Sequence, residues 1–113
     1  MYLNRFNELY GVSGELRVKE LEDKLITRLG SLCYHYIPPM LLQSGPYPAS
    51  YTCSVKEIWG DWQLNSEMNC QSREEALASL FTRNSELAGV IEDTECSQYA
   101  DILTSIVKEV YNV

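Results

Sequence analysis

Cys33 and His35 are the residues best suited to chemistry, and they lie close together in the stretch SLCYHYI. His35 is the only histidine, so a hydrolytic triad or a general base would have to be built around it. A thiol beside an imidazole can act as a nucleophile, and the two side chains share a face if residues 31–37 form a strand. No third ligand or orienting carboxylate lies nearby in sequence. We therefore favour a structural histidine and expect no catalytic residue.

The remaining sequence motifs argue against a metal or a cofactor. There is no glycine motif of nucleotide-binding proteins, no H-x-x-x-H pair and no deaminase signature. The four cysteines form no C-x-x-C pair, and although two disulfides are an alternative, we favour buried, reduced thiols. Glu92, Asp93 and Glu95 lack the layout of a calcium loop. We expect no metal and no cofactor, and an enzyme using Cys33 and His35 is the least favoured interpretation.

Charge is distributed unevenly along the chain. Residues 1–36 carry five basic and five acidic groups, whereas residues 37–113 carry four basic and eleven acidic ones, so the net charge of −7 arises after Tyr36. Such a field repels nucleic acid and anionic membranes and favours basic partners, although its plainer use is solubility. No apolar run approaches the roughly 20 residues of a membrane span, and no secretory signal opens the chain, so we expect a soluble, intracellular protein.

Residues 51–70, YTCSVKEIWGDWQLNSEMNC, have the pattern of an antiparallel hairpin around which the fold is organised. Gly60 and Asp61 suit a two-residue turn, because both tolerate positive φ. Extending the pairs outward from that turn gives these partners: Trp59 with Trp62, Glu57 with Leu64, Val55 with Ser66, Cys53 with Met68, and Tyr51 with Cys70. One face of the hairpin is then mostly apolar, so the register and the turn agree.

Helices are predicted on both sides of the hairpin by apolar residues at helical spacing. The first main helix follows Ser13 as N-cap, and Gly30 is a natural stop, yet we favour its continuation to residue 36. The second covers residues 73–83 and opens with a capping box between Ser72 and Glu75. The third covers residues 98–111. Shorter helices are expected over Tyr2–Tyr10 and, more weakly, within residues 85–95.

The stretch between the first main helix and the hairpin is open to two interpretations. Residues 31–37 continue the helical face, but their alternation also suits a third strand that ends where Pro38 and Pro39 forbid further pairing. Residues 40–50 contain Gly45, Pro46 and Pro48, and we expect a restricted connection without regular structure. Long ordered connections of this kind are often contact surfaces.

Tyrosine is unusually abundant, with eight residues in the chain. Tyrosine and tryptophan side chains are large and amphipathic, and they are enriched at protein interfaces. Tyr47, in the proline-containing connection, is the best candidate for an exposed contact. Trp59 and Trp62 form either a cross-strand aromatic pair or an exposed hot spot, and we favour the pair.

Several of these segments together resemble a known class of proteins. The helix ending in LITRLG, the hairpin with WGDW at its turn and the helix opening SREEALASLF look like the small α/β sandwich domains of many bacteriophage proteins of unassigned function. The resemblance covers residues 21–81. It implies an origin in a phage or another mobile element and offers no active site to carry over. Small acidic proteins of such origin often inhibit host defence by occupying nucleic-acid-binding surfaces, so by analogy the resemblance implies an anti-CRISPR-like inhibitor.

We therefore expect one α+β domain over residues 1–113, with a hairpin or a small three-stranded sheet packed by three main helices. The leading functional hypothesis is a non-enzymatic inhibitor of the anti-CRISPR or anti-restriction type in the cytoplasm of a host cell. Its partner would be a host protein with a basic surface, without direct contact to nucleic acid or membrane. The predicted contact residues are Tyr47, Glu86, Glu92, Asp93, Glu95 and Asp101. The alternative is a small structural or assembly protein that forms a homodimer through apolar helix faces.

Overall fold

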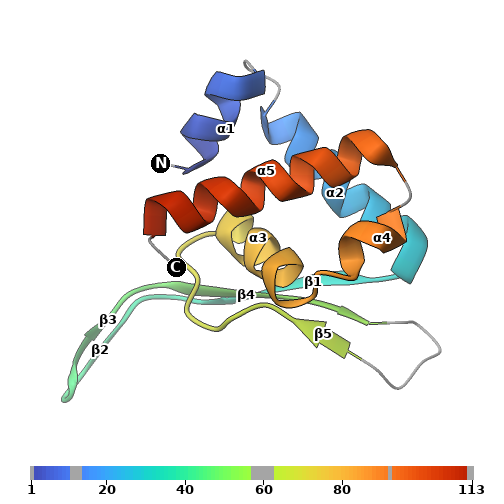
Figure 1. Ribbon diagram of the computed structural model, residues 1–113. Coiled ribbons are helices and arrows are strands. Elements are labelled where there is room, and N and C mark those ends of the chain that lie inside the picture. Colours follow the sequence, from blue (N-terminus) through green and yellow to red (C-terminus); the bar gives the residue numbers. More distant parts are fainter. Residues whose placement is uncertain (1, 11–13, 57–62, 92, 112–113) are drawn as a thin grey trace.

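The computed structural model describes residues 2–10, 14–56, 63–91 and 93–111 (Figure 1). Its elements have these bounds: α1 Tyr2–Tyr10, α2 Gly14–Leu29, β1 Leu32–Ile37, β2 Met40–Leu42, β3 Gly45–Tyr47, β4 Ser50–Lys56, β5 Gln63–Asn65, α3 Arg73–Arg83, α4 Leu87–Ile91 and α5 Thr94–Tyr111. The strands β1, β4 and β5 form an antiparallel sheet in the order β1-β4-β5, and β2 pairs with β3. The predicted α+β fold is confirmed.

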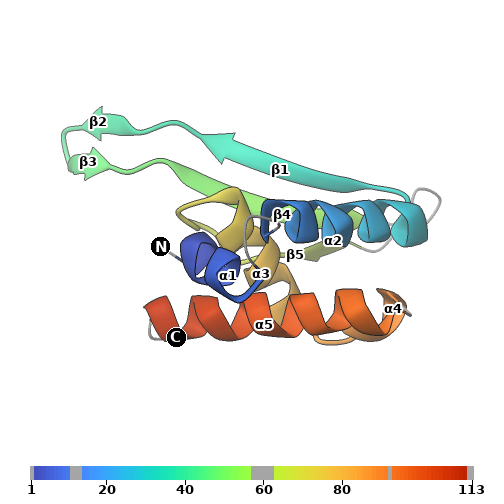
Figure 2. The same cartoon turned by 90° about the horizontal axis from the view of Figure 1, so that it is seen from above.

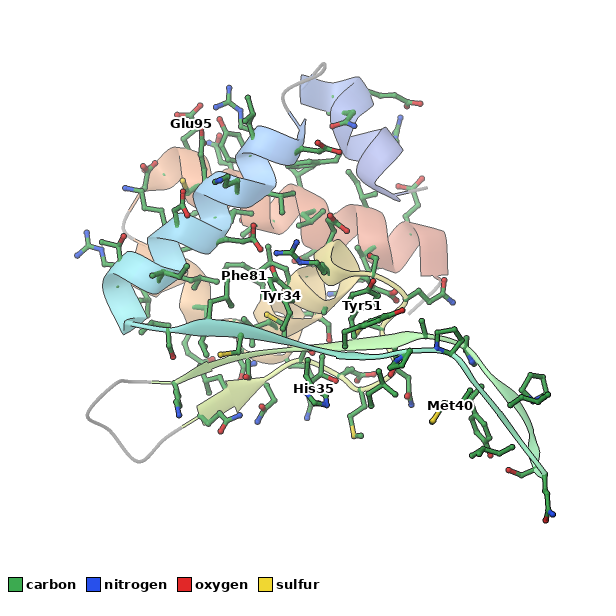
Figure 3. All side chains as sticks on the ribbon, turned by 180° about the vertical axis from the view of Figure 1, so that it is seen from behind. Tyr34, His35, Met40, Tyr51, Phe81 and Glu95 are labelled. Atoms are coloured by element: carbon green, nitrogen blue, oxygen red, sulfur yellow. The ribbon has the colours of Figure 1, made fainter. Side chains whose placement is uncertain are left out.

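The helices gather on one face of the sheet and leave the other face open (Figures 1 and 2). On β4, Cys53 and Val55 are buried, whereas Lys56 is exposed, as the alternation of a half-covered strand requires. Figure 3 shows Tyr34 and Tyr51 pointing to the helical layer and His35 pointing to the open side. The apolar face predicted for this part of the hairpin is therefore the core face.

The helix α2 ends earlier than we predicted. Gly30 adopts a left-handed φ of 92°, and its N–H donates to the Ile26 carbonyl at 2.8 Å, which closes the last turn. The preferred continuation of this helix to residue 36 is wrong, because residues 32–37 form the strand β1 along the free side of β4. The third strand that we kept as the alternative is confirmed, and it ends at Ile37, directly before the two prolines.

The connection after β1 is also more regular than predicted. Met40–Leu42 and Gly45–Tyr47 pair as β2 and β3, so the expectation of a connection without regular structure is wrong. The pair Ile37↔Ser50 of the main sheet is followed, three residues further on each strand, by Met40↔Tyr47. The register is therefore unbroken across the prolines. Residues 32–42 and 45–55 form one long hairpin, whose tip is a turn at residues 43–44. Directly after this turn, Gly45 has a positive φ of 125°.

The strand β5 pairs with β4 in a register two residues away from the predicted one. Val55 faces Leu64 instead of Ser66, and Lys56 faces Gln63. Because the shift is even, the side chains of β5 keep their predicted faces. Between Leu64 and Cys70 the chain has two residues more than the facing segment of β4 between Val55 and Tyr51. Cys70 nevertheless forms a β-bridge with Tyr51, its predicted partner. These extra residues leave Met68 73 % exposed, so its predicted place opposite Cys53 on the apolar face is wrong.

Ser66 gives the physical reason for the shifted register. Its backbone N–H donates to the Cys53 carbonyl at 2.8 Å, but the Cys53 N–H donates to the Ser66 hydroxyl, also at 2.8 Å, instead of a backbone carbonyl. The hydroxyl itself donates to the Glu67 carbonyl. The Ser66 hydroxyl thus takes the place of a backbone carbonyl as acceptor in the ladder, and the chain separates from β4 after this residue. Asn69, with a φ of 65°, completes the detour in the left-handed region that asparagine tolerates.

The C-terminal helices follow their predicted signals closely. The helix α3 has the predicted bounds, and the Ser72 hydroxyl accepts from the Glu75 N–H at 3.1 Å. The Glu75 carboxylate accepts from the Gln71 N–H, one residue before the predicted partner. The weak element within residues 85–95 is the short helix α4, and α5 begins at Thr94, four residues before the predicted start. The helix α1 has the predicted bounds, and its Phe6 is fully buried.

Several predicted features fall outside the described residues. They are the turn at Gly60 and Asp61, the pair Trp59 and Trp62, and the Ser13 cap.

The apolar faces of the main helices are used by the core of the chain itself. Leu21 and Leu25 of α2 and Leu103 and Val107 of α5 belong to one buried cluster. The route to a homodimer that we predicted, through apolar helix faces, is therefore not supported at these residues.

A Val107→Asp substitution should consequently unfold the protein rather than dissociate an oligomer. Burying an unpaired carboxylate costs about 3 kcal/mol or more of unfolding free energy. The matched control, Leu41→Asp, changes an 83 % exposed leucine and should alter stability by less than about 0.5 kcal/mol. Urea unfolding followed by circular dichroism measures both. A folded Val107→Asp variant of lower mass in light scattering would contradict this prediction.

A Ser66→Ala substitution should lower the free energy of unfolding by about 1 to 3 kcal/mol, because it leaves the buried Cys53 N–H without its acceptor. Urea midpoints at constant m-value measure the effect. The control is Ser105→Ala on the exposed side of α5, which should leave the midpoint unchanged or raise it slightly, since alanine favours helix. Equal midpoints for the two variants would show that Ser66 does not hold the strand.

Candidate partner-binding surfaces

The far half of the long hairpin, residues 38–49, is the hairpin arm. It projects beyond the helical layer and bends away from it (Figures 1 and 3). Its apolar side chains are largely exposed: Met40, Leu41, Leu42 and Tyr47. Pro39 lies opposite Pro48 where the ladder is interrupted, and with Met40 and Tyr47 these prolines line an open hollow of about 550 Å³. The arm is thus an apolar surface that no helix of the described chain covers.

The arm is also free of charge. From Tyr36 to Val55 the sequence contains no Asp, Glu, Lys, Arg or His, although 22 % of the chain is charged. At the base of the arm, the rings of Tyr36 and Tyr51 lie 4.8 Å apart at 38°. Near the tip, the hydroxyls of Ser44 and Tyr47 are 2.8 Å apart. Tyr47 therefore occupies the exposed position that the sequence predicted, on a strand rather than in a loop.

A second surface lies between α2 and the outer edge of β1, and we call it the edge groove. It is an open groove of about 610 Å³ that also reaches the first residues of α3. Leu16 and Ile26 of α2 line it and are 62 % and 45 % exposed. These two side chains lie off the buried face of α2 and line the groove. Neither residue was predicted as a site from the sequence, although an apolar residue off the core face of a helix is a signal of a contact surface.

Tyr34, Glu22 and Arg73 join three elements at the floor of the edge groove. The Tyr34 hydroxyl donates to Glu22 Oε2 at 2.5 Å, and Arg73 Nη2 lies 3.4 Å from the same oxygen. The Arg73 guanidinium also stacks over the Tyr34 ring, 4.6 Å from its centroid. Burial first, and then the hydrogen bond to Glu22, raises the pKa of Tyr34 far above its usual range. Tyr34 is therefore a neutral donor that holds the Glu22 carboxylate in place.

Cys33 and His35 lie on the open face of the sheet, and both are exposed. They share that face, as a strand requires, and their neighbours on β4 are Ser54 and Thr52. Neither neighbour is a carboxylate that could orient the imidazole. Within the described ranges, no group of three or more His, Cys, Asp and Glu side chains could hold a metal ion.

All four cysteines lie in the described part of the chain, and none of them forms a disulfide. Cys53, Cys70 and Cys96 are buried, but Cys33 is exposed, so the expectation of burial is wrong for that residue. Burial raises the pKa of Cys53 to about 12 and that of Cys70 to about 11. These thiols stay protonated at neutral pH and behave as small apolar groups.

One of the predicted acidic contact residues, Asp93, also has a structural role. Asp93 is the N-cap of α5, since its Oδ1 accepts from the N–H groups of Glu95 and Cys96 at 3.0 and 3.3 Å, and its Oδ2 lies 3.6 Å from Lys24 Nζ. The Cys96 N–H contributes most to lowering the pKa of Asp93. Asp93 therefore caps a helix and pairs with Lys24, while 38 % of its side-chain surface stays exposed to solvent.

The other acidic positions differ among themselves. Glu95 accepts a hydrogen bond from the Tyr99 hydroxyl, Glu86 and Asp101 are exposed, and Glu92 lies outside the described residues. Lys24 and Arg28 line the same hollow as Asp93 and Glu95, which offsets part of its negative charge. Figure 1 places α4 and the start of α5 at the opposite end of the molecule from the arm. Tyr47 therefore does not share one surface with Asp93 and Glu95 at the start of α5.

Comparison with protein-family models, curated proteins and solved structures finds no significant match to this chain. No helix in the described ranges is both long and apolar enough to cross a membrane.

Alkaline pH should destabilise the protein through Tyr34. Its pKa is raised in the folded state, so the folded chain keeps a proton that the unfolded chain loses near pH 10. The contribution of protonated Tyr34 to the free energy of unfolding is fully present below about pH 10 and is lost as the pH rises further. Urea unfolding at about pH 9 and about pH 11 should show a smaller loss in Tyr34→Phe than in the parent protein.

The control for this experiment is Tyr47→Phe, whose ring lies on the exposed arm. This variant should lose as much stability as the parent protein over the same pH interval. Identical losses in both variants would show that Tyr34 is not the group responsible.

Proposed function

We propose that the protein is a non-enzymatic protein-binding module whose hairpin arm is its principal contact. The observation that carries this proposal is the row of exposed apolar side chains at Met40, Leu41, Leu42 and Tyr47. Contiguous apolar surface on a folded chain marks an interaction site, because its exposure to water is unfavourable. The arm also offers backbone groups on both of its edges, and a partner strand can pair with these.

A protein partner is favoured over a membrane by the charge around the arm. Segments that insert into lipid surfaces gain much of their affinity from Lys and Arg beside the apolar residues. Here, the stretch from Tyr36 to Val55 has no basic residue, and the chain as a whole carries a net charge of −7. An anionic lipid surface would repel such a protein, whereas an apolar cleft of another protein accepts an uncharged arm.

A second candidate function is the inhibition of a basic, nucleic-acid-binding protein in the cytoplasm of a host cell. It is supported by the net charge and by the exposed carboxylates of Glu86 and Asp101. Such carboxylates act by taking the place of phosphate groups opposite Lys and Arg. This candidate uses residues on and before the helices α4 and α5, outside the arm (Figure 1), so one experiment can distinguish the two.

The test is site-specific photo-crosslinking in the cells that make the protein. A photoreactive amino acid in place of Leu41 should yield an adduct with one other protein, because the arm lies inside its partner. The same amino acid in place of Asp101 should yield an adduct with a basic protein if the second candidate holds. Gln63, a polar residue on the open face of β5, is the control position and should yield neither adduct.

Adducts at Leu41 that contain only lipid, or only a second copy of the chain, would overturn the first candidate. The absence of any protein adduct at Leu41 would do the same. A missing adduct at Asp101 would overturn the second candidate alone.

A further inference from the structure

The outer edge of β1 has backbone groups that no described strand uses. On β4, Tyr51 and Cys53 direct their backbone N–H and C=O groups to the side of β5, where they bond to Cys70 and Ser66. Neighbouring residues of an antiparallel strand point their groups to opposite sides, so Ser50, Thr52 and Ser54 bond toward β1. Their partners there are Ile37, His35 and Cys33. The backbone groups of Leu32, Tyr34 and Tyr36 therefore point away from the sheet, along its free edge.

The edge groove runs beside these free groups and has a definite chemical character. Glu15, Glu22, Asp23 and Glu74 line it together with two cations, Lys19 and Arg73. Arg73 already lies against Glu22 and the Tyr34 ring, so it neutralises charge at the floor of the groove. The exposed side chains of Leu16 and Ile26 add an apolar wall along α2. The groove thus combines a strand edge, an apolar wall and a net negative charge.

We propose that the edge groove binds an extended segment of the partner protein, which joins the sheet as an additional strand beside β1. Every second side chain of an added strand faces the helical layer. Those side chains would alternate between apolar residues, which pack on Leu16 and Ile26, and Lys or Arg, which meet the carboxylates of Glu15 and Asp23. This inference rests on the proposed function as a protein-binding module, and it specifies the chemistry of the partner segment.

A second copy of the chain suits the edge groove less well than a basic segment. Pairing β1 with the β1 of another copy would bring two grooves of net negative charge together, in chains that each carry −7. The position of β2 favours a longer partner segment, because β2 continues β1 in one register along the same hairpin. A segment leaving the edge groove therefore reaches the apolar arm directly.

The test uses the purified full chain and a synthetic peptide, acetyl-Thr-Lys-Thr-Leu-Thr-Arg-Thr-Leu-Thr-amide. Amide hydrogen exchange by NMR should show new protection at Leu32, Tyr34 and Tyr36, and none at Cys33 and His35, which already bond to β4. A peptide with Glu in place of Lys and Arg should not bind. Neither should a peptide with alternate backbone amides N-methylated, because it cannot complete the ladder.

Two charge reversals test the location of the site. Asp23→Lys should weaken binding of the basic peptide by about fivefold, as expected for loss and reversal of an exposed ion pair. The matched control is Glu109→Lys on the exposed side of α5, which makes the same change of charge and should leave the affinity within about twofold of the parent protein. Equal weakening by both variants would reveal general charge attraction and overturn the proposal.

Three other outcomes would overturn the proposal that a partner strand binds beside β1. Absence of peptide binding, or protection spread away from β1, would overturn the strand site, and so would dimerisation through the same edge in light scattering. The proposed function fails separately, when Leu41 yields no protein adduct in the crosslinking experiment. Peptide binding without that adduct would retain the edge site and exclude the arm as the principal contact.

Discussion

The pairing of β1 with β4 in a single register is the interaction on which the rest of the structure depends. It runs from Leu32↔Val55 to Ile37↔Ser50, and it resumes without a slip at Met40↔Tyr47. This register puts Cys53 and Val55 beneath the helices and sends His35 to the open face. A slip of one residue would exchange those faces and expose the core. The position of the arm and the free edge of the sheet both follow from the same pairing.

Burial inside the helical layer explains why the proposed contacts lie on the hairpin and on the outward side of α2 rather than on the core faces of the helices. The apolar face of α2 packs against α5 and β4, that of α5 packs against α2 and α3, and little of either is left for a partner. Exposed apolar groups remain on the arm and along the wall of the edge groove, at Leu41 and Leu16 among others. Both surfaces belong to the long hairpin or adjoin its outer strand. A partner that uses one of them is close to the other.

Features with local causes could mostly be predicted from the sequence, and features with distant causes could not. The start of α3 follows from Ser72, as predicted, because a cap depends on neighbours within one turn. The end of α2 has an equally local cause in Gly30, but we favoured a continuation to residue 36 because Leu32 and Tyr36 extend the helical spacing. The register of β5 depends on the hydroxyl of Ser66 replacing a bond of Cys53, 13 residues away in sequence, and no alternation pattern contains that information. The strands of the arm were missed because their prolines resemble loop signals, although proline is compatible with an edge ribbon. The capping hydrogen bonds of Asp93 were not predicted, because the predicted helix began at residue 98 and α5 begins at Thr94.

The unbroken register across Pro38 and Pro39 makes the reach of the arm independent of the folded core. Adding one cross-strand pair beyond the prolines would insert one residue in each strand and lengthen the hairpin by about 3.4 Å. No residue of the sheet or of the helices would have to change its neighbours. In the proposed binding mode, the depth to which the arm enters a partner's cleft would therefore change in steps of one residue pair, without new contacts in the core. The same scaffold can in this way be adapted to clefts of different depth by changing the length of one ribbon.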